Sequence, residues 1–216
     1  HMQAVVTDLS TACGPARERH EAICSLLKQS TRPLHDRLET SLGFPGTFES
    51  MSVYGQILLG FFRFYSGFDE LLRVHAPNLP PAFNVPRCLR SQFILEDLAA
   101  LGMQADAASR CELSFLNSPA HVVGALYVTE GSTLGGCVIH KFMLSRHGDE
   151  IRRCTRFLYG HGPRTASQWQ SFRNALIGYC DRAPELVSDV IEGAMLTFYA
   201  ITAELGQISQ SSGERR

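Results

Sequence analysis

The sequence lacks the short motifs that mark several large enzyme classes. It contains neither a G-x-x-x-x-G-K-[ST] phosphate loop nor a G-x-S-x-G nucleophile elbow. No internal histidine follows a glutamate by three positions, so the paired Glu-x-x-His motif of carboxylate-bridged di-iron bundles is absent. No flavin or nicotinamide motif is present either. These absences disfavour P-loop, serine-hydrolase and di-iron chemistry, and no tightly bound flavin or nicotinamide is expected.

The chain also has little net charge and no long apolar run. Its formal net charge is -1 and 19% of its residues are charged, which argues against a nucleic-acid platform or a polybasic membrane binder. The longest apolar runs, at 57–62 and 122–128, fall short of the roughly 20 residues that span a bilayer. No signal peptide is visible. We therefore expect a cytoplasmic protein that contacts neither nucleic acid nor membrane.

Paired cysteines are missing as well. The seven cysteines make an odd number with wide, irregular spacing, and no C-x-x-C pair occurs. The pattern therefore indicates neither a zinc ribbon nor a thioredoxin-type redox site. Reduced and mostly buried thiols are the simplest interpretation, which agrees with the expected cytoplasmic location.

Helical spacing of apolar residues recurs along the chain, whereas β-branched alternation never persists. The length suits one domain with a substantial core. We predict an all-α fold, a single-domain bundle over 18–208, between a disordered segment at 1–17 that opens with a His-Met tag remnant and a flexible tail at 209–216. Helix-start signals include Ser118-Pro119 and Pro184-Glu185. The predicted helices cover 18–42 (bent near Pro33), 50–75, 90–101, 118–146, 167–181 and 185–209.

One of the eight histidines has cations at helical spacing. Lys28, Thr31 and Arg32 precede His35 by seven, four and three positions, which places them on one helical face. An imidazole beside cations suits a ligand that carries both a metal and anionic groups, such as haem with its propionates. An amphipathic helix with a solvated basic edge explains the same stretch. Pro33 disfavours helical geometry at Arg32, so Arg32 is a less certain partner than Lys28.

Three glycines fall within six residues of a predicted helix, at Gly131, Gly135 and Gly136. Each one costs roughly 1 kcal/mol relative to alanine in a helix interior. Gly131 and Gly135 share a face, which they leave free of side chains. Close packing of another helix explains this strip. A flat ligand that lies directly against the backbone explains it equally well.

Three separated segments resemble the haem oxygenases, particularly the bacterial kind. KQSTRPLH at 28–35 is similar to their proximal signature, LYVTEGSTLGG at 126–136 to their distal signature, and VIEGAMLTF at 190–198 to their last helix. The resemblance implies a bundle of the haem oxygenase type, with haem held between a proximal helix and a kinked distal helix. The helical domain at 18–208 would be that domain.

The resemblance also implies roles for residues on the proximal side. His35 would be the axial ligand to the haem iron. Lys28 and Arg32 would hold a propionate, with Thr31 on the same face. Phe198, on the last helix, would pack against the macrocycle.

On the distal side, Gly131 and Gly135 would lie over the haem, with Tyr127 and Arg173 as further propionate partners. The mammalian-type enzymes carry an aspartate in the distal helix, and Ser132 takes its position here. Proton delivery would then run through the Ser132 hydroxyl, backbone groups and water. Glu130 lies about 100° around the helix from Gly131, so we expect it to pair with a neighbouring cation instead.

The resemblance implies oxidative opening of haem to biliverdin, Fe(II) and CO, with haem as both cofactor and substrate and O2 as oxidant. Electrons would come from a ferredoxin or a flavoprotein reductase. A bacterial phytochrome is a possible acceptor of the bilin, and iron acquisition is the other biological role. Two alternatives stay open, namely a non-catalytic haem transport or sensing protein with this fold, and a helical bundle of the thiaminase or di-iron oxidase kind.

Overall fold

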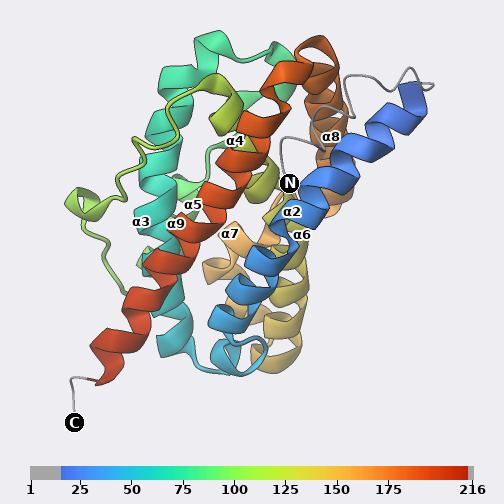
Figure 1. Cartoon of the computed structure of the whole chain (residues 1–216). Helices are drawn as coiled ribbons and strands as arrows, with labels where there is room; N and C mark the ends of the chain where they lie inside the picture. The colour runs from blue at the N-terminus through green and yellow to red at the C-terminus, as the bar shows by residue number, and fades with distance from the viewer. Residues whose placement is uncertain (1–15, 214–216) are drawn as a thin grey trace.

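The chain folds around two long apolar helices, α6 (Pro119–His147) and α9 (Val187–Gly213). The computed structural model describes residues 16–213, and side chains within 22–206. No β-strand occurs in that part of the chain, so the predicted all-α class is confirmed. In Figure 1, α9 runs diagonally across the front, with α3 (Met51–His75) on one side and α2 (Ala16–Leu42) on the other. The remaining elements are α4 (Val85–Cys88), α5 (Ser91–Ala100), α7 (Arg156–Tyr159), α8 (Thr165–Arg182) and seven 3-10 turns: η1 (Gly46–Glu49), η2 (Ala76–Asn78), η3 (Pro81–Phe83), η4 (Ala107–Ser109), η5 (Asp149–Cys154), η6 (Gly162–Arg164) and η7 (Pro184–Leu186).

Glycines bring α6 and α9 together. A Cβ built on Gly124 of α6 would lie 2.0 Å from the Val190 carbonyl oxygen, and one on Gly193 of α9 would lie 2.2 Å from the His121 oxygen. Any side chain at either position would overlap the opposing backbone. This crossing fixes α9 as the floor against which α2, α3 and α6 all pack.

The apolar character of α6 and α9 has a structural explanation. Both helices are long and apolar enough to cross a membrane by length and composition, contrary to what the short uninterrupted runs indicated. Half of each apolar window is buried inside the bundle. Core helices of folded domains meet the same criterion, so these two helices are weak evidence for a membrane span.

The helix boundaries follow local signals closely. The Ser118 hydroxyl accepts a hydrogen bond from the His121 N–H at 3.1 Å, and Pro119 occupies the first turn of α6. The helix ends at Gly148, whose φ of +80° favours glycine. Helix α2 continues through Pro33 without a restart. Likewise α6 is unbroken through its three glycines.

At the ends of the chain, Ala16 and Arg17 already belong to α2, and α9 continues to Gly213 through part of the predicted tail. The rest of the predicted disordered segment, residues 1–15, lies outside the described residues. The six cysteines at 24, 88, 111, 137, 154 and 180 are all free, as predicted.

Candidate functional site

Helices α2 and α6 run in the same direction and meet near two positions. At one end, the Tyr127 side chain of α6 is hydrogen-bonded to Thr31 of α2. At the other end, just beyond α2, the Phe44 and Phe142 rings meet edge to face at 5.2 Å between centroids. Each helix rises about 20 Å between these two contacts. The two contacts therefore bracket a stretch of α2 and α6, two helices that both pack against α9.

His35 lies within this bracket, level with the glycines of α6. It follows Thr31 by four residues, just as Gly131 follows Tyr127, so both lie one helical turn inside the same contact. The His35 side chain is 53% exposed, and its Nδ1 lies 3.8 Å from carboxylate oxygens of Asp36 and Glu39. Carboxylates near Nδ1 orient an imidazole and leave Nε2 as the atom that can bind a metal.

Phe198 of α9 forms the floor beside His35. Its side chain is 6% exposed, and its ring meets the His35 imidazole edge to face with 6.0 Å between centroids. The structure thus brings the sequence segments around 35 and 198 together. An exposed imidazole next to a buried aromatic ring offers a polar ligand atom at the edge of an apolar surface.

An apolar strip of α6 is open within the bracket. The strip consists of Gly131, Leu134, Gly135 and Val138, which share one face by their spacing. Leu134 is 38% and Val138 is 59% exposed, and a Cβ on Gly135 would have no neighbour within 4 Å. Contiguous exposed apolar residues are unusual unless they contact a ligand or partner. We refer to these four residues as the open strip.

The three glycines serve different purposes. A Cβ on Gly136 would lie 2.9 Å from the Leu158 carbonyl oxygen, so this glycine is required by close packing. A Cβ on Gly131 would touch the Trp169 ring at 3.4 Å, an ordinary contact. Only at Gly135 does packing give no reason for glycine. Packing therefore explains Gly136, whereas the space beside Gly135 is open to a ligand.

A hydroxyl pair lies beside the open strip. Ser132 is exposed, donates to the Thr129 carbonyl oxygen at 2.8 Å, and lies 3.5 Å from the hydroxyl of Tyr65 in α3. Burial raises the pKa of Tyr65 to about 12, and the hydrogen bond with Ser132 opposes that rise. Tyr65 therefore stays protonated near neutral pH and can donate a hydrogen bond. Sequence reasoning predicted Ser132 but missed Tyr65, which is 67 residues away along the chain.

The predicted cations occupy the expected side of the site. Lys28 and Arg32 of α2 are exposed, and neither has an ion-pair partner among the residues that the structure describes. Arg173 of α8 is half-buried and close enough to Tyr127 for its charge to lower the pKa of that phenol. Burial acts more strongly and raises the pKa of Tyr127 overall. The expected propionate partners are therefore spread over α2, α6 and α8 around Thr31.

Glu130 points away from the open strip, as expected. Its side chain is 2% exposed and lies 3.5 Å from Arg87 and 3.3 Å from His161 Nε2. Burial alone would raise the pKa of Glu130, but the hydrogen bond with His161 and the charges of Arg90 and Arg87 hold the pKa below its ordinary value. Glu130 is therefore an ion-pair residue behind the distal face, and its predicted pairing with cations is confirmed.

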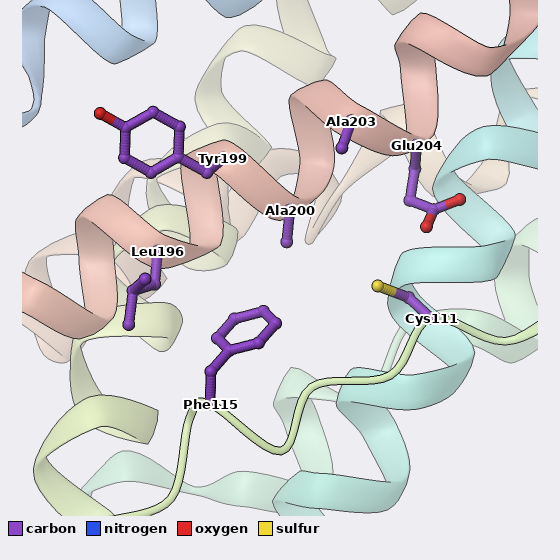
Figure 2. A pocket seen from close by; sticks show the side chains of 7 residues that line it. All are labelled: Cys111, Phe115, Leu196, Tyr199, Ala200, Ala203 and Glu204. Carbon is purple, nitrogen blue, oxygen red and sulfur yellow. The ribbon is translucent and has the colours of Figure 1, made fainter.

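An apolar surface cavity lies elsewhere on α9. Its volume is about 320 Å³, and none of the predicted site residues lines it. At about 100° per residue, its α9 residues lie on roughly the opposite side of the helix from Phe198. Figure 2 shows the side chains that line it, which are Cys111, Phe115, Leu196, Tyr199, Ala200, Ala203 and Glu204. The cavity is therefore separate from the site between α2 and α6.

The comparisons with known proteins agree with this geometry. The family model described as heme oxygenase matches residues 21–203. The structure resembles that of the NO- and CO-bound heme oxygenase from Neisseria meningitidis, with a TM-score of 0.67, 24% identity, and coverage of 86% of this chain and 91% of that chain. Comparison with curated proteins gives no match.

These observations define first a class and then a family. The strand-free arrangement of the described helices and the likeness to a solved structure are those of an all-α bundle of the haem oxygenase type. Because the family model covers most of the sequence, this chain belongs to the haem oxygenase family.

Proposed function

We propose that this protein binds haem between α2 and α6 and opens it oxidatively to biliverdin, Fe(II) and CO, using O2 and electrons from a ferredoxin or a flavoprotein reductase. One observation carries the proposal. His35 on α2 and the open strip on α6 both lie between the Thr31–Tyr127 contact and the Phe44–Phe142 contact. The residues present fit haem, because Gly135 leaves backbone uncovered where a flat ligand needs access. Family membership supports the class of reaction.

The residues of α2 and α9 would hold the haem. His35 would supply the axial ligand through Nε2, since its Nδ1 already faces Asp36 and Glu39. Phe198 would contact the macrocycle from α9. Lys28 and Arg32, which have no ion-pair partner within the described part of the chain, would offer positive charge on α2 to the propionates. When bound, haem supplies the iron at which O2 is reduced, and the protein positions and protects it.

The residues of α6 would orient the reaction. Leu134 and Val138 exclude water from the distal face, and Gly135 allows close approach of the backbone. Ser132 and Tyr65 provide a pair of hydroxyls beside that face, and the Tyr65 hydroxyl, which burial keeps protonated, can donate a hydrogen bond to Ser132. Proton delivery from this pair would take the place of the aspartate found in mammalian-type enzymes.

Turnover of added haem tests the proposal. Haem is titrated into the protein without oxygen, then oxygen is admitted with ferredoxin and its reductase, or with ascorbate. Loss of the Soret band and a biliverdin peak on chromatography are the expected results. A stable oxygen complex with no pigment would instead assign the protein to haem transport or sensing. Failure to bind haem stoichiometrically would contradict the proposed site itself.

A further inference from the structure

A second, basic cavity lies at the far end of α6. Its volume is about 410 Å³, and side chains from α5, α6, η5 and α7 meet there. None of them belongs to the site between α2 and α6. The lining residues are Glu96, His140, Arg152, Arg153, Arg156 and Tyr159.

Positive charge predominates around this cavity. Three arginines line it against a single carboxylate, that of Glu96, which is paired with Arg156 at 3.1 Å. Arg152 is paired with Asp149, also at 3.1 Å. Arg153 has no ion-pair partner within the described residues. The cavity therefore offers at least one unpaired guanidinium to an anion.

A buried imidazole with one unused nitrogen also lines the cavity. His140 is 5% exposed, and its Nε2 is buried without a hydrogen-bond partner in the described part of the chain. Its Nδ1 lies 2.9 Å from the Thr155 hydroxyl oxygen. That hydroxyl donates its only proton to the Ile151 carbonyl oxygen at 3.0 Å. The Thr155 oxygen can then only accept from His140, so Nδ1 carries the proton and Nε2 holds a free lone pair.

Burial and a nearby positive charge both disfavour protonation of this imidazole. Burial and, less strongly, the charge of Arg152 lower the pKa of His140 from its ordinary value. The other groups around the ring are Glu96 from α5, Arg153 from η5, and Arg156 and Tyr159 from α7; the Tyr159 ring lies 5.0 Å from the imidazole between centroids. An occupant that satisfies this site must offer negative charge to the arginines and a proton to Nε2.

We propose that this cavity binds a phosphate group, either as inorganic phosphate or as a phosphate monoester. Inorganic phosphate keeps at least one proton throughout the neutral range, whereas a phosphate monoester, whose second pKa is about 6, keeps one in only part of its population. That proton donates to His140 Nε2, while the other oxygens accept from Arg153 and its neighbours. Sulfate offers the same size and charge but no proton, so it leaves the Nε2 lone pair against an anionic oxygen.

Competition between phosphate and sulfate tests the proposal. Each anion is titrated calorimetrically into the full chain at pH 6.0, 7.0 and 8.0, at constant ionic strength. We expect phosphate to bind roughly tenfold more tightly than sulfate at pH 7.0 to 8.0, the value of one charge-assisted hydrogen bond. The ratio should be smallest at the lowest pH, where the protonated share of His140 is greatest and a protonated imidazole donates to either anion. A nucleoside monophosphate as a third probe distinguishes a monoester from the free ion, since tighter binding of the monoester identifies the monoester as the source.

Two variants separate the parts of the site. Arg153→Gln, on an exposed side chain, should weaken phosphate binding several-fold, whereas Arg164→Gln, outside the cavity, should not. His140→Gln places an amide donor at the imidazole, so it should remove the preference for phosphate and its pH dependence while the far-ultraviolet circular dichroism stays unchanged. Equal affinity of the unaltered protein for the two anions at every pH, or an equal response of the two arginine variants, would overturn the proposal. None of these readouts depends on haem.

Discussion

Single residues decide whether a ligand can approach the backbone of α6. Gly135 and Gly136 are adjacent and equally costly to a helix, yet a Cβ meets nothing at the first and the Leu158 backbone at the second. The sequence alone cannot separate them, because their difference lies in what another segment places opposite each one. Similarly, the proton position on His140 follows from a threonine fifteen residues away.

Alanine substitutions at the two glycines should therefore have opposite effects on stability. Gly135→Ala should leave the free energy of unfolding unchanged or raise it by up to about 1 kcal/mol, since alanine favours the helix. Gly136→Ala should lower it by about 1–3 kcal/mol, because the new methyl group overlaps a carbonyl oxygen. Urea denaturation measures both. Equal destabilisation by the two variants would mean that Gly135 is packed after all.

A larger side chain at Gly135 should affect the ligand rather than the fold. Gly135→Leu should retain the unfolding midpoint of Gly135→Ala but lose most biliverdin formation, because leucine would occupy the distal face. Haem affinity should fall less than turnover. Full turnover by Gly135→Leu would show that the open strip does not face the haem.

At the scale of elements, a buried carboxylate holds in place the short helix α7, which no sequence pattern predicted. Both oxygens of the Asp97 carboxylate accept hydrogen bonds at 2.8 Å, from the N–H groups of Arg156 and Phe157 at the start of α7. A four-residue helix has little stability of its own. Asp97, from α5, therefore positions α7, and Leu158 of α7 in turn packs against Gly136.

This cap should make stability depend on pH. Burial raises the pKa of Asp97 from 3.8 to about 6, although the two backbone hydrogen bonds oppose the rise. Between about pH 4 and 6 the folded state thus binds more protons at Asp97 than the unfolded state, so this residue's contribution to stability falls as pH rises. The difference in free energy of unfolding between the unaltered protein and Asp97→Asn should decrease from pH 4 to 6 and level off above. A difference that is constant over this range would contradict the assigned pKa.

At the scale of the whole molecule, the sequence predicted the class of fold, the six long helices and the glycine-rich distal segment. Helical periodicity is local, so it needs no knowledge of the tertiary structure. The Tyr65–Ser132 pair and the Arg87–Glu130–His161 cluster were not foreseen as sets, because their members come from distant segments. Helix α2 also continues through Pro33, because packing of α2 on α9 outweighs the loss of one backbone hydrogen bond.

The cluster of Glu130, Arg87 and His161 joins α6, α4 and the segment before η6. Its loss should therefore lower the stability of the whole bundle. Glu130→Ala should lower the free energy of unfolding by about 3 kcal/mol, because it leaves the largely buried Arg87 without a counter-charge. Glu192→Ala, on an exposed side chain, is the control. Removing Arg87 together with Glu130 should recover part of the loss. Additive losses in the double variant would show that the two residues act independently.

The central claim is that haem lies between His35 and the open strip, with His35 as the iron ligand. The most direct measurement is the absorption spectrum and turnover of the haem complex of His35→Ala, beside His75→Ala as a matched histidine control. We predict that His35→Ala loses the histidine-ligated spectrum and biliverdin formation, that added imidazole restores both in part, and that His75→Ala changes neither. An unaltered spectrum in His35→Ala would show that another residue binds the iron and would contradict the account.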